Sequence, residues 1–399
     1  MPGSSRPRER MRLLMITDFT EQFSYRLLRG IMSWSRQQEQ PWVVCKMPPS
    51  YKREIGIPKV IEWAGNWGID VVIGQFDPGE DVSLFRKNGI VAIAQDYIAP
   101  FKEIPNITAD YILTGKMAAR RLNGHGFRHF GFFGYDNVCW SDGRLQGFRE
   151  SLREEYGVET LHVFNNRQLS SMWNYDIAEL QRWLHSLPKP IGIFACDDNQ
   201  SEILLETCQA SGINVPMEVA IIGVDNDEVT CNLTVPALSS INVDIERAGY
   251  EVAEMATRMV QDPSYGGEDI VIRPVAVIGR GSTGIQATSD PVVAAAMRYI
   301  YQNRARKILV SDVVDQVPVS RRLLEQRFKE VTGASLYTVI SSLRIDYFAQ
   351  QLVSTSDTVS EIAARMDDPD TKSLSRRFRA LKGCTPTEYR KQFLRKLGV

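Results

Sequence analysis

The residues best suited to chemistry lie in two arginine-rich helical patterns near the C-terminal end of the chain. In the first pattern Arg322, Glu325 and Gln326 are spaced by three and four residues, which places them on one face of a helix. Guanidinium and amide groups can form paired hydrogen bonds with the edges of guanine and adenine. A merely solvated helix face gives the same spacing, but Ser320 before it is typical of an N-cap. Because a short apolar helix precedes it, the pattern predicts a recognition helix for the DNA major groove.

A second pattern of the same kind follows. An apolar helix over residues 359–364 precedes another basic amphipathic helix. One face of that helix is formed by four residues, Thr371, Lys372, Ser375 and Arg376. Between the two patterns, residues 335–355 predict a single helix of roughly 28 Å at 1.5 Å per residue. Such a helix would hold two recognition helices about one DNA turn apart.

The turn of the second pattern is unusual because it reads Met366-Asp367-Asp368-Pro369-Asp370. Three carboxylates before a helix favour its dipole, but they face DNA phosphates unfavourably. We therefore expect this unit either to contact DNA weakly or to contribute mainly structure. A sensor with impaired DNA binding is an alternative that follows from the same residues.

Charge divides the chain into two parts. Residues 286–399 carry 19 Lys and Arg against 12 Asp and Glu, whereas residues 1–285 carry 28 against 36. A basic module attached to an acidic remainder fits an end that binds a polyanion and an end that does not.

The acidic part alternates short apolar runs with helical patterns. Continuous runs such as 71–74, 191–194 and 219–223 are typical of parallel strands that are covered on both faces. Seven or so such units are too many for one small sheet. The sequence therefore predicts an α/β fold with two doubly wound parallel-sheet lobes, followed by an all-α domain with two helix-turn-helix motifs.

Two carboxylates directly follow apolar strands of this part. Asp197 follows the run 191–195, and Asp225 follows the run 219–223. Both should stand at carboxyl strand ends, where doubly wound folds bind ligands. Carboxylates accept strong hydrogen bonds from sugar hydroxyls. A helix N-cap is the alternative role for such an Asp.

Three further residues fit a sugar site. Arg144, at the start of a helix, can donate to ring or hydroxyl oxygens. Trp140 precedes it, and Phe19 follows the first strand beside Asp18, so these rings could cover the flat C–H face of a sugar.

Other classes of protein fit the sequence less well. The six cysteines form no C-x-x-C pair and the four histidines no H-E-x-x-H motif, so we expect no metal, cofactor or disulfide framework. No apolar stretch reaches the length of a membrane span or signal-peptide core, which favours a cytoplasmic protein. A carbohydrate-active α/β enzyme that uses Asp197 and Asp225 as its acid and nucleophile is an alternative. The sequence has no G-x-S-x-G elbow and no P-loop to support it.

The C-terminal part resembles the DNA-binding domain of the AraC/XylS family. The matching residues are Ile362-Ala363, Leu374-Ser375-Arg376-Arg377-Phe378, Gly383 and Thr385-Pro386-x-x-Tyr389-Arg390. The resemblance implies that Arg322, Glu325 and Gln326 face bases, while Arg321 and Arg327 contact phosphate. It also implies promoter DNA as the partner, and a contact with RNA polymerase is a further expectation.

The front part resembles the periplasmic-binding-protein-like sensor of LacI/GalR regulators. The matches include Asp110-Tyr111, Arg144-Leu145-Gln146-Gly147-Phe148, Asp197-Asp198, Ile221-Ile222-Gly223-Val224-Asp225 and Arg280-x-Ser282-Thr283. The resemblance implies a ligand site at Arg144, Asp197 and Asp225, a homodimer, and a small sugar effector such as the pentose D-xylose.

These observations define the expected organisation. Residues 1–11 are expected to be a disordered tail, with Met11 as an alternative start, and residues 12–280 the sugar-sensing domain. Residues 281–291 are expected to form a linker and residues 292–399 the DNA-binding domain. Together they predict a sugar-responsive transcription regulator, in which ligand closes two lobes and re-aims the DNA-binding domains of a dimer.

Overall fold

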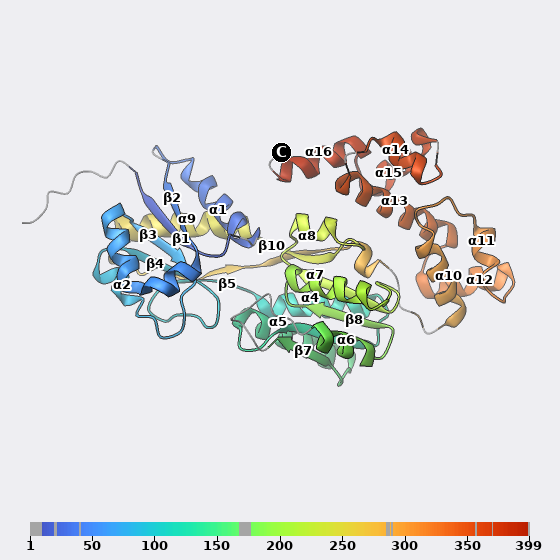
Figure 1. Ribbon diagram of the computed structural model, residues 1–399, viewed down its shortest axis with the longest axis horizontal. Coiled ribbons are helices and arrows are strands. Elements are labelled where there is room, and N and C mark those ends of the chain that lie inside the picture. Colours follow the sequence, from blue (N-terminus) through green and yellow to red (C-terminus); the bar gives the residue numbers. More distant parts are fainter. Residues whose placement is uncertain are drawn as a thin grey trace, which may run out of the picture. The chain divides into compact units, whose positions relative to one another are not determined.

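The computed structural model describes most of the chain (Figure 1). The described residues are 10–19, 22–39, 41–166, 177–284, 288, 290–355, 357–368 and 370–397. Most of the expected N-terminal tail, and Pro369 in the acidic turn, lie outside these residues. Contacts divide the chain into two units, of which the first comprises residues 1–115, 135–147 and 242–276 and the second the rest. Each unit is described by itself.

The first unit contains a six-stranded sheet in the order β11-β5-β4-β3-β1-β2, with parallel pairing throughout. Its strands are β1 (Arg12–Ile16), β2 (Val43–Met47), β3 (Val71–Gly74), β4 (Val91–Gln95), β5 (Asn106–Ala109) and β11 (Ile270–Ile272). Its helices are α1 (Gln22–Ser35), α2 (Pro49–Trp67), α3 (Ser83–Lys87) and α9 (Ile245–Gln261). Strand β3 is buried along its whole length, as its continuous apolar sequence predicts.

The second unit contains another six-stranded sheet, in the order β12-β10-β9-β8-β6-β7. Its strands are β6 (His129–Tyr135), β7 (His162–Asn166), β8 (Ile191–Ala195), β9 (Val219–Val224), β10 (Ser239–Val243) and β12 (Pro274–Ile278). The helices in this part of the chain are α4 (Tyr111–Gly124), α5 (Cys139–Tyr156), α6 (Ile177–Ser186), α7 (Asp198–Ala210) and α8 (Glu228–Leu233).

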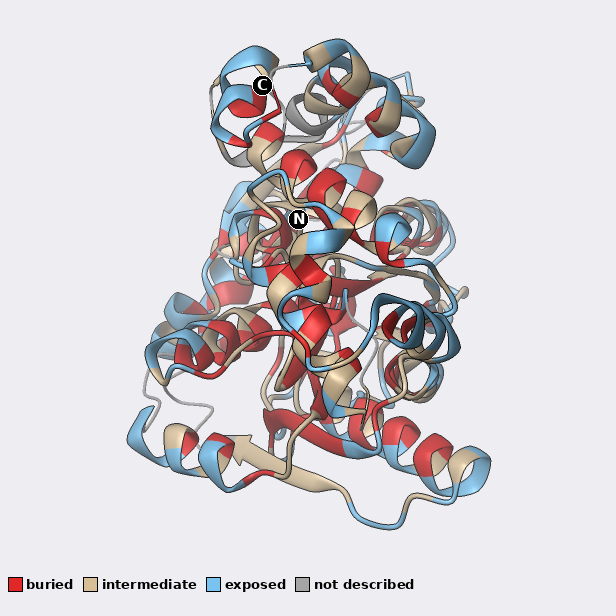
Figure 2. Ribbon diagram, turned by 90° about the vertical axis from the view of Figure 1, so that its right-hand side faces the viewer, coloured by how far each residue is buried: buried red, intermediate tan, exposed pale blue. Residues whose placement is uncertain are grey.

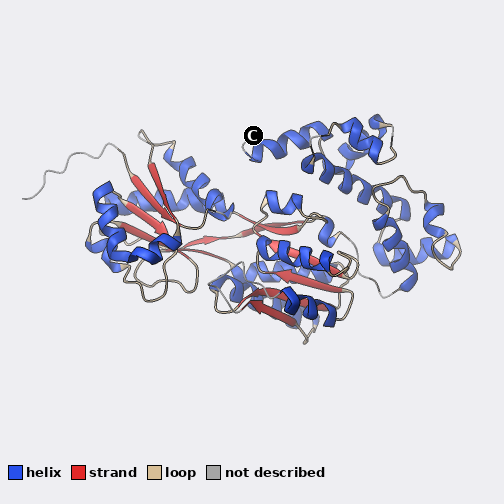
Figure 3. Ribbon diagram, viewed as in Figure 1, coloured by secondary structure: helices blue, strands red, loops and turns tan. Residues whose placement is uncertain are grey.

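Both sheets have the strand order of a doubly wound fold. In each, the second strand along the chain pairs outside the first, and the third pairs on its other side, so the order reverses next to the first strand. Ligands bind such sheets outside the carboxyl ends of the strands, near this reversal. Figure 3 shows the two sheets, each with helices packed around it, and Figure 2 shows that their strands are largely buried. The predicted two-lobe α/β architecture is confirmed.

The start of the expected linker is hydrogen-bonded to strands of the second sheet. Residues Gly281–Thr283 form a short 3-10 helix, and Ser282 and Thr283 are fully buried. The Ser282 hydroxyl donates to the carbonyl of Ile221 at 2.6 Å and accepts the amide of Ser239 at 2.8 Å. The segment is rich in Gly, Ser and Thr, a composition typical of linkers. Here, however, the hydroxyls replace missing backbone partners inside the sheet, which is how buried polar groups are tolerated.

The C-terminal part is entirely helical among its described residues. Its helices are α10 (Pro291–Gln302), α11 (Val310–Val314), α12 (Arg321–Thr332), α13 (Leu336–Ser354), α14 (Val359–Arg365), α15 (Thr371–Lys382) and α16 (Pro386–Leu397). Two separate apolar cores form, one around α11 and α12 and one around α14 and α15. Helix α13 contributes Leu343 to the first core and Phe348 to the second, so it joins the two helix-turn-helix units as predicted. No helix in the described part of the chain is long and apolar enough to span a membrane.

Backbone contact between α1 and α9 gives the first prediction. A Cβ atom built on Gly30 would overlap the carbonyl oxygen of Glu246 and crowd the Cα of Gly249. Replacing Gly30 by Ala should therefore destabilise the protein by about 1–3 kcal/mol through overpacking, measured as a lower midpoint of thermal unfolding. Gly65 of α2 has open space around its Cβ position, so Gly65→Ala is the matched control and should not lower the midpoint. Equal midpoints for both variants would contradict the close packing.

Candidate functional site

Helix α12 presents the first predicted set of DNA-contacting residues. Ser320 caps the helix by accepting the amide of Leu323 at 3.4 Å, as its sequence position predicts. Leu324 and Phe328 are fully buried, which turns the opposite face outward. The residues exposed on that face include Arg321, Arg322, Glu325 and Gln326.

Two side-chain pairs order this face. The Nε atom of Arg321 lies 2.9 Å from an Oε1 atom of Glu325, and Gln326 donates to Glu330 at 2.9 Å. Exposed pairs of this kind contribute under about 1 kcal/mol, so DNA can replace them at small cost.

Arg327 does not share this arrangement. It is only partly exposed, and its Nη1 atom lies 3.6 Å from Oδ2 of Asp290, the residue that caps α10. Its guanidinium is therefore directed to the neighbouring helix, and the predicted phosphate contact stays a prediction.

Helix α15 presents the second predicted set. Asp370 caps it by accepting the amide of Ser373 at 3.0 Å, and Leu374 and Phe378 are buried. Lys372 and Arg376 are exposed. Thr371 and Ser375, the other two members of the set, are partly exposed on the same helix.

The acidic turn before α15 has a structural explanation that the sequence did not reveal. Asp367 adopts a left-handed conformation with φ 52°, as glycine commonly does after a helix. Asp370 is used as the N-cap. Asp368 is only 4% exposed, so its charge is held inside the domain. The expectation of three carboxylates facing the phosphates is therefore not met for Asp368, whereas Asp370 is exposed at the start of α15.

Two arginines neutralise Asp368. Its Oδ2 atom accepts Nη2 of Arg377 at 2.6 Å and Nη2 of Arg344 at 3.2 Å. Arg344 comes from α13 and also donates to the carbonyl of Met366 at 3.1 Å. Burial lowers the pKa of Arg344, and the Asp368 carboxylate acts against that effect. This cluster ties the turn to the long helix and to α15.

The segment from Gly383 to Arg390 closes the domain in four ways. Gly383 ends α15 with φ 75°, and Thr385 and Glu388 form a capping box at the start of α16. Tyr389 packs edge-on against Phe378, with 5.4 Å between ring centroids. Arg390 donates to the carbonyl of Leu352 at 2.7 Å at the end of α13.

In the second unit, Asp197 and Asp225 stand at the carboxyl ends of neighbouring strands β8 and β9, as predicted. Asp197 caps α7, since its carboxylate accepts the amide of Gln200 at 2.6 Å. Its alternative role as a cap is thus realised, and one carboxylate oxygen is already used in it. Asp225 has a φ of 96° and lies in the turn after β9. Its backbone amide donates to the carbonyl of Ile241 at 3.0 Å.

Arg280 is a residue of this turn region to which sequence reasoning assigned no role. Its Nη2 atom donates to the side chain of Asn226 at 2.7 Å, and its Nη1 atom donates to the carbonyl of Leu238 at 2.8 Å. It thereby holds the residue that follows Asp225. The resemblance to LacI/GalR sensors contains Arg280, which was the available signal.

In the first unit, Asp18 and Phe19 follow the carboxyl end of β1. The ring of Phe19 packs edge-on against Tyr25, and Nζ of Lys46 lies 4.7 Å from the Phe19 centroid. A cation therefore already occupies one face of this ring.

Arg144 and Trp140 lie in the first turns of α5, also within the first unit. Arg144 is only 6% exposed, and its guanidinium carbon lies 5.5 Å from the Trp140 ring centroid and 5.7 Å from that of Tyr111. The Tyr111 hydroxyl donates to Oδ2 of Asp96 at 3.2 Å. Burial, together with the Asp96 charge, raises the pKa of Tyr111 well above its usual value.

Sequence reasoning missed Asp96 and Tyr111 in this cluster. Asp96 follows the apolar strand β4, so it carries the same strand-end signal as Asp225. Burial raises the pKa of Asp96, and the bond from Tyr111 acts in the opposite direction.

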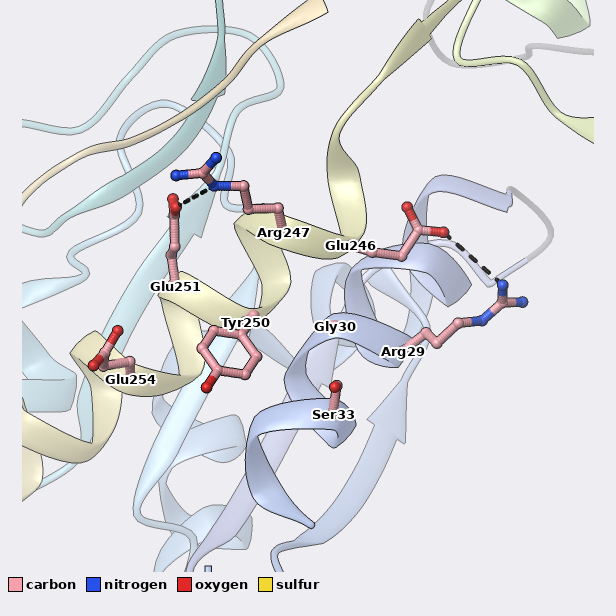
Figure 4. A pocket seen from close by; sticks show the side chains of 8 residues that line it. All are labelled: Arg29, Gly30, Ser33, Glu246, Arg247, Tyr250, Glu251 and Glu254. Atoms are coloured by element: carbon pink, nitrogen blue, oxygen red, sulfur yellow. Dashed lines mark hydrogen bonds and ion pairs between the residues drawn. The ribbon is translucent and has the colours of Figure 1, made fainter. Parts of the chain in front are cut away.

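A surface groove of about 580 Å³ lies elsewhere in the first unit, between α1 and α9. Figure 4 shows Arg29 directed toward Glu246 and Arg247 paired with Glu251 on its rim. None of the predicted sugar or DNA residues lines this groove.

Comparisons with known proteins agree with both parts of the chain. Residues 119–283 match the periplasmic binding protein-like domain family, and residues 313–392 match a helix-turn-helix domain family. The xylose operon regulatory protein of Escherichia coli K12 is 27% identical over 400 residues, which are 96% of this chain and 97% of that protein. The corresponding protein of Haemophilus influenzae is 29% identical and covers 81% of this chain and 85% of its own.

A solved structure matches nearly the whole length of the chain. The xylose-binding transcription activator XylR is 25% identical, with a TM-score of 0.72, and the match covers 96% of this chain and 98% of that one. The chain is a transcription regulator. It joins a periplasmic-binding-protein-like sensor to an AraC-type DNA-binding domain, and its full-length relatives are regulators rather than enzymes.

The buried cluster around Asp368 gives the second prediction. Asp368→Ala leaves the buried guanidinium of Arg344 without its carboxylate, so it should lower the free energy of unfolding by about 3–5 kcal/mol. Urea unfolding followed by circular dichroism measures the effect. Asp367→Gly is the control in the same turn and should cost no stability, because glycine favours the left-handed conformation found there. A loss below about 1 kcal/mol for Asp368→Ala would show that the ion cluster contributes little.

Proposed function

We propose that this regulator senses a small sugar, a pentose such as D-xylose, and controls an operon for the catabolism of that sugar. The observation that carries the proposal is the similarity of nearly the whole chain to regulators of xylose operons. Polar residues at carboxyl strand ends in both units supply the chemistry that a sugar needs. The regulator would act in the cytoplasm, where promoter DNA is found.

We assign the sugar contacts by chemistry. Asp225 and the Asp197 carboxylate would accept hydrogen bonds from sugar hydroxyls, and charged acceptors strengthen such bonds. Arg144 would donate to ring or hydroxyl oxygens. Trp140 would cover an apolar C–H face, as would Phe19, next to Asp18.

The proposed switch links the sugar to DNA through two lobes. A sugar that binds the closed state more tightly shifts the population toward it, and a full switch needs about 5.5 kcal/mol of differential binding. In a homodimer, closure would re-aim the two DNA-binding domains on their half-sites. In α15, the second recognition helix, the face that contacts DNA would consist of Thr371, Lys372, Ser375 and Arg376. RNA polymerase is the protein partner expected at the promoter.

Asp225→Ala tests the sugar site. Loss of hydrogen bonds to a charged acceptor costs about 1.5–3 kcal/mol each, so D-xylose should bind about tenfold to a hundredfold more weakly in calorimetric titration. Glu206→Ala is the matched control, because Glu206 is an exposed carboxylate on α7 of the same unit. Wild-type affinity in Asp225→Ala would refute the assignment of this residue.

Arg322→Ala tests the DNA-reading face of α12. Removal of a guanidinium that reads a base should weaken specific promoter binding by about 1–3 kcal/mol in a gel shift. Arg298→Ala removes one exposed positive charge from α10 of the same domain, so it controls for net charge. If the two variants bind the promoter equally well, Arg322 does not read bases.

A further inference from the structure

Beneath the turn that carries Asp225 lies a second, hidden carboxylate. Asp198 is the first residue of α7 and is only 2% exposed. Neither a sugar nor DNA can reach it without unfolding of the turn. Its position between α7, β9 and α8 raises the question of what it does.

The Asp198 carboxylate connects three elements. Its Oδ2 atom accepts the backbone amide of Asp227 at 2.8 Å and the thiol of Cys231 on α8 at 3.4 Å. A Cβ atom built on Gly223 of β9 would overlap both Asp198 and the Ser201 hydroxyl. The strand therefore passes so close to this carboxylate that no side chain fits between them.

The turn above Asp198 has a backbone conformation that needs such support. Asp225 and Asn226 have φ values of 96° and 51°, which residues other than glycine rarely adopt. Conformations of this kind cost about 1–3 kcal/mol each and persist only where the surroundings hold them.

Three consecutive amides of this turn find partners on other elements. The amide of Asp225 donates to the carbonyl of Ile241, and that of Asn226 donates to the Ser240 hydroxyl at 3.0 Å. The third, of Asp227, donates to Asp198. Strand β10 thus holds the first two positions of the turn, and Asp198 holds the last one.

We propose that Asp198 is a positioning residue for sugar binding, which fixes the turn on which Asp225 stands by anchoring the Asp227 amide and the start of α8. This role rests on the proposed sugar site. Asp198 itself does not touch the ligand.

The charge state of Asp198 supports a specific form of this role. Burial first, and the neighbouring Asp225 charge second, raise the pKa of Asp198 well above its ordinary value. Other groups that face it are Asp227 and Cys231 on the side of α8, Ser240 on β10, and Ser201 on its own helix. Its neutral form supports the turn without repelling Asp225, whereas its ionised form adds a second negative charge beside it.

Hydrogen–deuterium exchange of residues 224–231 tests the positioning role without any ligand. Asp198→Ala should increase exchange in this segment, because the Asp227 amide loses its acceptor. Asp198→Asn retains a side-chain oxygen at the same place and should restore protection. Glu206→Ala, on the exposed side of α7, should exchange as the wild type does.

Calorimetric titration with D-xylose tests the consequence for binding. Asp198→Ala should bind about tenfold more weakly, and Asp198→Asn within about threefold of the wild type. As the pH is raised, the wild-type affinity should fall once Asp198 ionises, while the affinity of Asp198→Asn should stay level. If Asp198→Ala does not fold, this comparison of pH profiles still decides.

The outcomes separate this proposal from the proposed function. Unchanged exchange and unchanged affinity in Asp198→Ala, or identical pH profiles for the wild type and Asp198→Asn, would overturn the positioning role. If the wild type binds no pentose but Asp198→Ala still exchanges faster in residues 224–231, the sugar assignment fails and the anchoring of the turn stands.

Discussion

Burial of both faces of a parallel sheet is the constraint on which the sensor part depends. When strands such as β3, β8 and β9 are apolar on both faces, polar chemistry is confined to the strand ends. Because parallel strands share one direction, their carboxyl ends meet at one edge, and Asp197 and Asp225 become neighbours there. The turns that follow the strands at this edge are held in part by side chains. Arg280 and Asp198 do this for the turn after β9.

The DNA-binding part depends on a different constraint, which is that one helix must serve two small cores. Each helix-turn-helix unit has its own apolar core, and α13 supplies residues to both. Two hydrogen bonds attach the second helix-turn-helix unit to this helix. Arg344 of α13 donates to Asp368, and Arg390 donates to the carbonyl of Leu352 on α13. The unusual acidic turn is thus part of the attachment of that unit to α13.

The sequence predicted the elements with strong patterns and missed those with weak ones. The apolar strands, the long helix and the capped recognition helix Arg321–Thr332 follow from local patterns of burial and capping. Strand β10 was missed because Ser239 and Ser240 look like loop residues, although their hydroxyls are paired inside the sheet. The burial of Asp368 could not be predicted, because its partner Arg344 is distant in sequence. For Asp197 the sequence left a cap and a ligand contact open, and the cap is present.

The ion pair between Arg327 and Asp290 bears on how a signal enters the DNA-binding part. Asp290 caps α10 at the point where the chain arrives from the sensor, and Arg327 belongs to the reading helix α12. The incoming chain is therefore anchored beside the first reading helix, whereas the second is reached only through α13. A displacement of the incoming chain would therefore act on α12 through this ion pair, whereas it would reach α15 only through α13.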